Sequence, residues 1–208
     1  MKGQLFNEME LDSRVCDCCQ TGGTMTDSGP VFVYRDRSEG EIRDMSFVRK
    51  VDNKWTAPKL IAKDNWYING CPVNGPKISS YKNQFATVWF TAANEQPTVK
   101  VAFGVGQAFN PPIIIDSMQP LGRVDIIMLD EQRAIVSWIG THKGETVIKA
   151  AKVNIDGSQS PPFIIAEINE ARGSGFPQME IFESQLYFAW TAVNGTSSSI
   201  LMKKVSLN

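Results

Sequence analysis

Apolar residues recur at every second position over short stretches of the chain, which is the pattern of half-buried β-strands. Four apolar stretches end in an aromatic residue: VFVY at Tyr34, TVWF at Phe90, IVSW at Trp138 and YFAW at Trp190. A polar loop and an alternating segment follow each of them, at residues 42–48, 99–103, 147–153 and 200–205. No stretch shows the 3.6-residue period of an amphipathic helix convincingly. The pattern therefore predicts an all-β protein.

The aromatic stretches recur at intervals of 56, 48 and 52 residues. Three of the repeated units close with a turn and a proline-containing apolar segment, at residues 53–62, 107–116 and 157–166. A further short strand is expected before each aromatic stretch. Four antiparallel strands in about 50 residues is the size of a β-propeller blade. A β-sandwich with regularly spaced strands is the alternative, but it does not require the same aromatic and proline positions in successive units.

The repeats predict a single β-propeller domain over residues 1–208, with blades at approximately 10–64, 65–117, 118–167 and 168–208. The fourth unit lacks a closing strand, and residues 4–9 (QLFNEM) are expected to supply it in a closed ring. Residues 4–9 could equally end a blade of a larger ring, or two chains could complete one ring. Because four blades is the lower limit for propellers, a closed small propeller and part of a larger ring both stay open.

Composition narrows the classes of partner. The 21 basic and 22 acidic residues give a net charge of −1, which disfavours nucleic acid, since phosphate binding needs clustered Lys and Arg. No apolar run approaches the roughly 20 residues that span a bilayer, so no membrane partner is expected. The start MKGQLFNEMELD lacks the apolar core of a signal peptide. Either the chain is cytoplasmic or the beginning of a longer exported protein is missing. No cofactor is required by the sequence.

The blade topology gathers charged and aromatic residues at one end of the molecule. Loops leading into the first strand of each blade and loops joining the second and third strands lie on one face, around the central channel. Arginines from several blades at this mouth suit a carboxylate, because guanidinium presents a planar fork to it. The predicted ligand-binding residues are Arg35, Arg37, Trp66, Asn74, Arg123, Asp125 and Arg172, with Arg43 in reserve. The alternative is a structural network in which the arginines pair with Asp36, Glu41 and Asp125.

The charged loop after Tyr34 also holds candidate catalytic groups. Asp36, Glu39 and Glu41 could supply acid and base chemistry, and Tyr34 or Tyr67 a nucleophile. No spacing rule requires these roles, and a merely solvated loop is the alternative. His142, the single histidine, is expected in a loop as a solvated residue.

Cys16, Cys18, Cys19 and Cys71 form the other candidate cluster. Cys16 and Cys71 open the first and second blades, which predicts that they are neighbours. A disulfide, a soft-metal site for copper(I) or zinc, and a set of reduced thiols are all open, with reduced thiols the default in the absence of a signal peptide. The C-x-C-C spacing is not the usual C-x-x-C of a zinc knuckle.

The segments RVCDCCQT, GPVFVYRDRSEGEIRDM, GCPVNGP, VWFTAA, PLGRVD, VSW and SGFPQM resemble, in order and over nearly the whole chain, bacterial sialidase-like proteins of the BNR-repeat, exo-α-sialidase type. The chain is similar to the C-terminal half of longer members that carry a signal peptide and further blades. The resemblance implies a β-propeller and an anionic or carbohydrate ligand. The Asp-box turns of sialidases survive only in eroded form, at residues 52–56 and 104–109, and the arginine motif of the sialidase N-terminal blade is not present. No catalytic set is therefore transferred.

Two functions are consistent with these observations. The first is a sialidase-like propeller that binds a small anionic or sugar ligand at the channel mouth; if it is an enzyme, it is a glycosidase of sialidase type. The second is a non-enzymatic assembly module whose blades associate with another copy of the chain, as a homo-oligomer.

Overall fold

The computed structural model describes residues 8–168 and 175–207, and the predicted closing strand at 4–9 lies mostly outside this part of the chain. The described residues form four antiparallel sheets in chain order. Sheet 1 contains β1 (Gly22–Thr26), β2 (Gly29–Arg35), β3 (Met45–Val51), β4 (Lys54–Trp55) and β5 (Lys59–Leu60). Sheet 2 contains β6 (Lys77–Tyr81), β7 (Gln84–Thr91), β8 (Thr98–Val105), β9 (Ala108–Phe109) and β10 (Ile113–Asp116). Sheet 3 contains β11 (Gly122–Met128), β12 (Arg133–His142), β13 (Glu145–Asn154) and β14 (Phe163–Glu167). Sheet 4 contains β15 (Gln178–Phe182), β16 (Gln185–Asn194) and β17 (Ser197–Ser206).

The predicted all-β class and the four repeated antiparallel units are confirmed. In each sheet the strands follow one another as hairpins, and in sheets 1 and 2 the outermost position is shared by two short strands that both pair with the third strand. A single 3₁₀ turn, η1 (Ala93–Glu95), interrupts the β structure of the described residues. None of these residues belongs to a helix long and apolar enough to cross a membrane.

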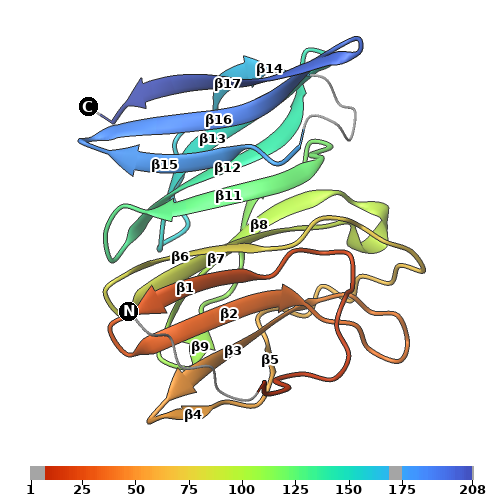
Figure 1. Cartoon of the computed structure of the whole chain (residues 1–208), viewed down its shortest axis with the longest axis vertical. Coiled ribbons are helices and arrows are strands. Elements are labelled where there is room, and N and C mark those ends of the chain that lie inside the picture. Colours follow the sequence, from red (N-terminus) through yellow and green to blue (C-terminus); the bar gives the residue numbers. More distant parts are fainter. Residues whose placement is uncertain (1–7, 169–174, 208) are drawn as a thin grey trace.

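The sheets stack in chain order, with sheet 1 at the bottom and sheet 4 at the top of Figure 1. Their first strands lie next to one another: β1 beside β6, β6 beside β11, and β11 beside β15. This is the arrangement of propeller blades around their inner strands. The first and last sheets lie at opposite ends of the stack in Figure 1, so the described residues form an open series of blades. Whether residues 4–9 close the ring stays a prediction, because residues 1–7 are not described.

Each interface between sheets is filled by apolar side chains. Sheets 1 and 2 meet at Val33, Phe47, Phe85 and Trp89. Sheets 2 and 3 meet at Val88, Phe103, Val124 and Trp138. Sheets 3 and 4 meet at Ile135, Ile148, Phe188 and Trp190. Because the middle sheets are covered on both faces, β7 and β12 are buried almost continuously, which explains why their sequences are apolar runs rather than strict alternations.

The repeated aromatic residue has a defined structural role at the blade junctions. The indole Nε1 of Trp89 donates to Asp64 at 2.8 Å, and that of Trp138 donates to Asp116 at 2.7 Å. A lysine directly across the hairpin from each tryptophan completes the contact, Lys100 with Asp64 and Lys149 with Asp116. The aspartates come from the end of the preceding blade, so each group joins two blades.

Sheet 1 has a variant of the same contact, in which the Tyr34 hydroxyl donates to Asp12 at 2.6 Å. Tyr34 faces Ser46 across the hairpin, where sheets 2 and 3 have lysine and sheet 4 has Leu201. The equivalent positions of sheets 2 and 3 also correct the aromatic repeat that was predicted from the sequence. Trp89, not Phe90, occupies the position of Trp138, because Phe90 points to the opposite face and packs toward sheet 3. Both residues are aromatic, so the sequence alone did not separate them.

The junction contact should contribute measurably to stability. We expect Asp116→Ala to lower the free energy of unfolding by about 1.5–3 kcal/mol, because the buried Trp138 N–H and the Lys149 ammonium lose their shared acceptor. Asp156→Ala is the control, since Asp156 accepts only from Ser158 in an exposed turn. Urea unfolding followed by tryptophan fluorescence measures both variants. Equal stability losses in the two variants would contradict the proposed role of the contact.

Candidate functional site

The loops at one end of the sheets pack together as the blade topology predicts. The β2–β3 loop forms one isolated bridge with the segment before β1, between Asp36 and Val15, and another with the segment before β6, between Ile42 and Tyr67. The carboxylate of Asp44, which is buried, accepts from the backbone N–H groups of Asn65 and Trp66 at 3.0 and 3.1 Å. Burial raises the pKa of Asp44, partly offset by these two hydrogen bonds.

Arg35 lies at the centre of this packing and is only 1% exposed. Its guanidinium donates to three backbone carbonyls, those of Arg43, Asn74 and Phe90, at 2.7–3.2 Å. It also lies over the ring of Trp66, 4.7 Å from the centroid. Trp66, itself buried, packs edge-on against Phe90. Arg35 and Trp66 were both predicted to bind a ligand, but in this structure their polar and aromatic surfaces are used to join sheets 1 and 2.

Glu41 is the meeting point of three arginines, of which Arg43 is buried. Its carboxylate accepts from Arg14 at 3.2 Å, from Arg37 at 3.0–3.1 Å and from Arg43 at 3.0 Å. Hydrogen bonds from Arg37 and Arg43 hold the pKa of Glu41 below its ordinary value. This is the contact pattern of the structural network that the sequence left as an alternative. Both Glu41 and Arg37 face partners within the loop rather than open space.

The other candidate catalytic residues do not converge. Asp36 accepts from the Arg37 backbone N–H and the Ser46 hydroxyl, at 2.6 and 3.0 Å. Glu39 is exposed at the tip of the loop. Burial and the neighbouring Asp12 raise the pKa of Tyr34, which disfavours the phenolate that a nucleophile needs. Tyr67 is 64% exposed, and His142 is exposed at the end of β12.

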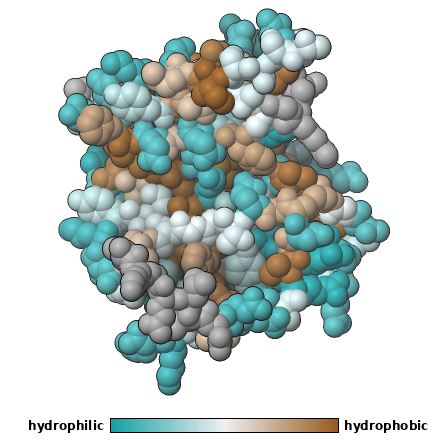
Figure 2. All heavy atoms as spheres, in the orientation of Figure 1, coloured by the Kyte–Doolittle hydropathy of each residue, from teal (hydrophilic) through white to brown (hydrophobic). Residues whose placement is uncertain are grey.

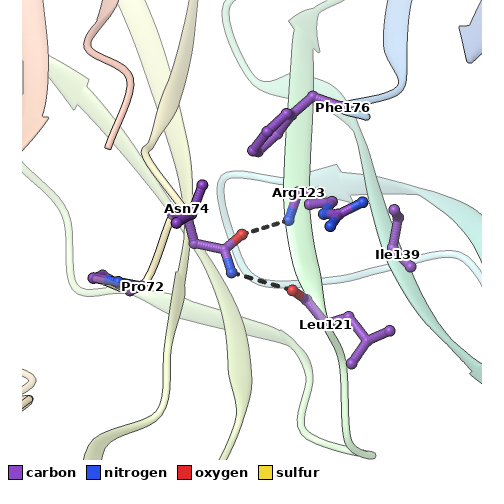
Figure 3. A pocket seen from close by; sticks show the side chains of 7 residues that line it. Pro72, Asn74, Leu121, Arg123, Ile139 and Phe176 are labelled. Atoms are coloured by element: carbon purple, nitrogen blue, oxygen red, sulfur yellow. Dashed lines mark hydrogen bonds between the residues drawn. The ribbon is translucent and has the colours of Figure 1, made fainter. Parts of the chain in front are cut away.

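Arg123 and Asn74 do come together, in a cavity of about 230 Å³ between the loops of sheets 2, 3 and 4. Figure 3 shows their side chains with Phe176, which approaches from the opposite wall. The Arg123 guanidinium lies 5.5 Å from the centroid of the Phe176 ring and donates to the carbonyl of Gly175 at 2.9 Å. The cavity is lined by Pro72, Val73, Asn74, Leu121, Arg123, Ile139 and Phe176.

A backbone irregularity aims Arg123 into this cavity. The β11–β12 register shifts between Gly122 and Asp125, and Arg123 has a left-handed backbone with φ of 51°. The Asn74 side chain holds the bulge by accepting from the Arg123 N–H at 2.8 Å and donating to the Leu121 carbonyl at 3.2 Å. A Cβ on Gly122 would lie 2.5 Å from the Asn74 oxygen, so only glycine fits there. A left-handed non-glycine residue costs roughly 1–3 kcal/mol, so the contacts of Asn74 and the bulge offset that cost here.

Asp125 lies deeper, in a polar cavity of about 300 Å³ that is lined by the inner strands of all four sheets. Its carboxylate accepts from the backbone N–H groups of Ile126 and Met179, at 3.0 and 2.7 Å. Burial raises its pKa. Lys77 and Gln178, which the sequence analysis did not select, line the same cavity and hydrogen-bond to each other at 3.0 Å. Arg172, the remaining predicted ligand-binding residue, lies outside the described residues.

The four cysteines lie together at the mouth. Cys18 is bonded to Cys71, and the free thiols of Cys16 and Cys19 have their Sγ atoms 3.2 Å apart. Cys71 is thus bonded to Cys18, whose sulfur lies 3.6 Å from that of Cys16. The default of reduced thiols is wrong for Cys18 and Cys71. Burial raises the pKa of Cys19. Burial would also raise that of Cys16, but hydrogen bonds with Cys19, the Cys18 backbone and Arg43 lower it.

Comparison with known proteins gives independent evidence for the fold. No protein-family model matches the chain, and no curated protein matches it. Among solved structures, a Hadza microbial sialidase aligns with 15% identity and a TM-score of 0.55, over 88% of this chain and 43% of its own. The Bacteroides ovatus xyloglucan PUL protein GH43B aligns with 9% identity and a TM-score of 0.55, over 92% and 39%. The GH43 protein BlXynB of Bacillus licheniformis aligns with 12% identity and a TM-score of 0.54, over 92% and 40%.

These likenesses show the β-propeller fold that the sequence predicted. The chain spans about two fifths of the length of these three structures. The solved propellers it resembles include a sialidase and GH43 proteins, so the fold is one that glycoside hydrolases use.

The Glu41 contacts predict a pH dependence of stability. Because the folded-state pKa of Glu41 lies below its unfolded value, its contribution is present above pH ~4.3 and is lost as the pH falls through the lower, folded-state pKa. We expect Glu41→Gln to lower the melting temperature at pH 7 and the difference from the wild type to shrink below pH ~4. Glu39→Gln, two positions away, is the matched control. A pH-independent difference would contradict the assignment.

Proposed function

We propose that the chain binds a small carboxylate-bearing ligand, such as an acidic sugar, in the cavity lined by Asn74, Arg123 and Phe176. The observation that carries this proposal is the Arg123 guanidinium, which the β-bulge at Gly122 directs to a cavity made by loops of three blades. Guanidinium matches a carboxylate, and an aromatic wall suits the apolar face of a sugar ring. The volume of about 230 Å³ is below that of drug-sized pockets and favours a ligand of monosaccharide size.

Binding is better supported than hydrolysis by the described residues. Glycoside hydrolysis needs two carboxyl groups that flank the scissile bond. The described residues that line this cavity include no aspartate or glutamate. Glu41, the best-placed carboxylate of the β2–β3 loop, is held by three arginines. Among the described residues, the geometry therefore supports recognition of an anion, and glycosidase activity rests on the fold likeness alone.

The proposal is tested by ligand-induced changes in melting temperature. We expect N-acetylneuraminate and galacturonate to stabilise the wild type and galactose to do so far less, since it lacks the carboxylate. Arg123→Ala should weaken binding by about 10- to 100-fold, the loss of one charge-assisted contact. Calorimetric titration gives the affinities.

Arg133→Ala is the control, because Arg133 pairs with Asp130 in an exposed turn, outside this cavity. Fluorogenic glycosides, including a sialoside, are assayed in parallel, and turnover that Arg123→Ala abolishes would add hydrolysis to the assignment. Absence of any shift with all three sugars would contradict the proposed site.

A second candidate function rests on the outer face of sheet 4. Phe182, Ile200 and Met202 project from this face and are 62%, 71% and 60% exposed. The corresponding faces of sheets 2 and 3 are covered by the next blade. Figure 2 shows hydrophobic side chains among hydrophilic ones at the upper end of the molecule, where sheet 4 lies. We propose that a second copy of this chain packs against this face of sheet 4, because its blades offer the same kind of apolar sheet face.

Ile200→Lys combined with Met202→Lys should convert a dimer to a monomer in sedimentation velocity. Charged side chains on both positions would be buried without partners in the assembled face. Met118→Lys is the matched control, since Met118 is 75% exposed in the loop before β11 and away from this face. A wild-type chain that stays monomeric at all concentrations tested would contradict the assembly.

A further inference from the structure

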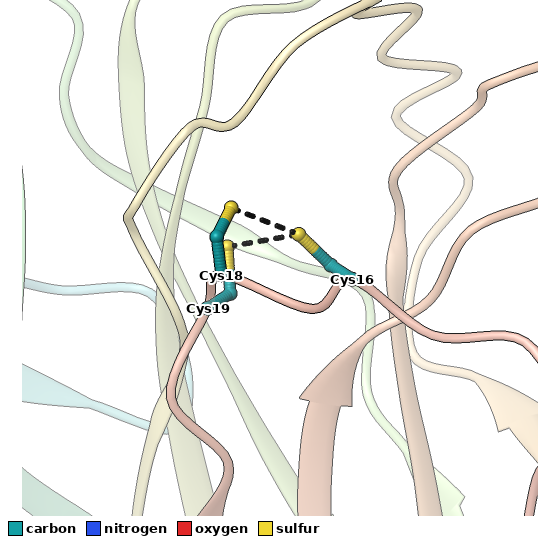
Figure 4. Close-up of side chains that lie close together, drawn as sticks. All are labelled: Cys16, Cys18 and Cys19. Atoms are coloured by element: carbon teal, nitrogen blue, oxygen red, sulfur yellow. Dashed lines mark hydrogen bonds between the residues drawn. The ribbon is translucent and has the colours of Figure 1, made fainter.

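Three cysteine sulfurs form a cluster in the loop that precedes β1, and the fourth is attached to it by a disulfide from the loop that precedes β6. The Sγ atom of Cys16 lies 3.6 Å from that of Cys18 and 3.2 Å from that of Cys19, and all three atoms lie within 4.8 Å of one another. Figure 4 shows the three side chains converging from one turn of the chain. Cys71, bonded to Cys18, brings the fourth sulfur from the loop of the next blade.

We propose that reduction of the Cys18–Cys71 disulfide converts this cluster into a four-thiolate site for one zinc-class metal ion. A Zn–S distance of about 2.3 Å in a tetrahedron places the sulfurs roughly 3.8 Å apart. The separations of 3.2 and 3.6 Å are close to that value. Cys16, Cys18 and Cys19 are therefore already close to the spacing of metal ligands. Cys71 has to turn toward them once its bond to Cys18 is broken, so the ligands come from two adjacent blades.

The charges around the cluster suit such a site. Four thiolates and one divalent ion carry two negative charges, and two buried arginines are in position to offset them. Arg43, 3% exposed, donates from Nη1 to Cys16 Sγ at 3.1 Å. Its Nε is buried without a hydrogen-bond partner among the described residues. Arg35 is also buried and interacts electrostatically with Cys19. Buried cations of this kind stabilise thiolate ligands.

The surrounding backbone is already fixed, so the site does not have to be built on binding. The Cys16 N–H donates to the Arg35 carbonyl at 2.9 Å. Gly75 approaches Gln20 so closely that a Cβ would lie 2.1 Å from the Gln20 carbonyl oxygen. Cys71 is exposed, which gives a reductant access to the disulfide. The disulfide and the metal ion are therefore alternative crosslinks between the same two loops.

The chemistry balances in two steps. A trialkylphosphine and one water reduce the Cys18–Cys71 bond to two thiols, and the phosphine becomes its oxide. The four thiols then release four protons to the buffer as they bind one divalent ion. Metal binding is accordingly favoured by higher pH.

The test compares oxidised and phosphine-reduced protein under anaerobic conditions. Co²⁺ is added as a spectroscopic probe and then displaced by Zn²⁺. We expect the reduced wild type to bind one equivalent, with the thiolate charge-transfer and d–d absorption of tetrahedral cobalt, and the oxidised protein to bind none. Arg43→Gln should weaken binding by about 10-fold, the size of an outer-shell effect.

Cys71→Ser, which removes both the disulfide and one ligand, should bind Co²⁺ more weakly and with a less intense thiolate charge-transfer band, because water replaces one thiolate. Circular dichroism and melting confirm that each protein remains folded, and the comparison of oxidised with reduced wild type needs no substitution. Reduced, folded wild type that binds neither Co²⁺ nor Zn²⁺ would overturn the proposal. An unchanged cobalt spectrum in Cys71→Ser would also overturn the four-ligand site. Neither result depends on the proposed acidic-sugar site.

Discussion

The junctions of sheet 1 with sheet 2 and of sheet 2 with sheet 3 depend on one repeated interaction, a buried carboxylate at the end of one blade that accepts from a tryptophan in the next. Asp64 with Trp89 and Asp116 with Trp138 have the same geometry, and Asp12 with Tyr34 is its counterpart at the first sheet. Apolar packing alone is non-directional and would let two sheet faces slide. A hydrogen bond to a charged acceptor fixes the angle and depth at which each blade meets its neighbour. The tryptophan side chain therefore buries apolar surface and, through its N–H, also fixes how one blade is oriented against the next.

A second constraint orders the loops at the mouth. The Arg35 guanidinium satisfies carbonyls from the β2–β3 loop, the loop before β6 and the end of β7. Loops have few backbone partners of their own, and buried carbonyls without partners are costly. One buried arginine provides hydrogen bonds to several such carbonyls at once. This explains why a charge lies in the most buried part of a region whose sequence looks like a solvated loop.

Strand periodicity predicted the blades because sheet faces are the dominant source of burial, and the repeated aromatic position marked the junctions. The site was less predictable, since charge and residue type do not determine burial. Arg35 and Arg123 are both arginines next to strands, yet one is enclosed by carbonyls and the other faces a cavity. The difference comes from a β-bulge at Gly122, which only the pairing of β11 with β12 reveals. The Cys18–Cys71 pairing likewise follows from the approach of two loops and not from spacing.

The cysteine cluster and the cavity share one short segment. Cys71 is followed directly by Pro72, Val73 and Asn74, which form one wall of the cavity. Asn74 also holds the Arg123 bulge. A crosslink at Cys71 removes conformational freedom from the segment that positions Arg123, and pre-organised groups bind with less loss of entropy. The thiols and the arginine therefore belong to one structural unit, in which the crosslink at one end of the segment restrains the binding group at the other.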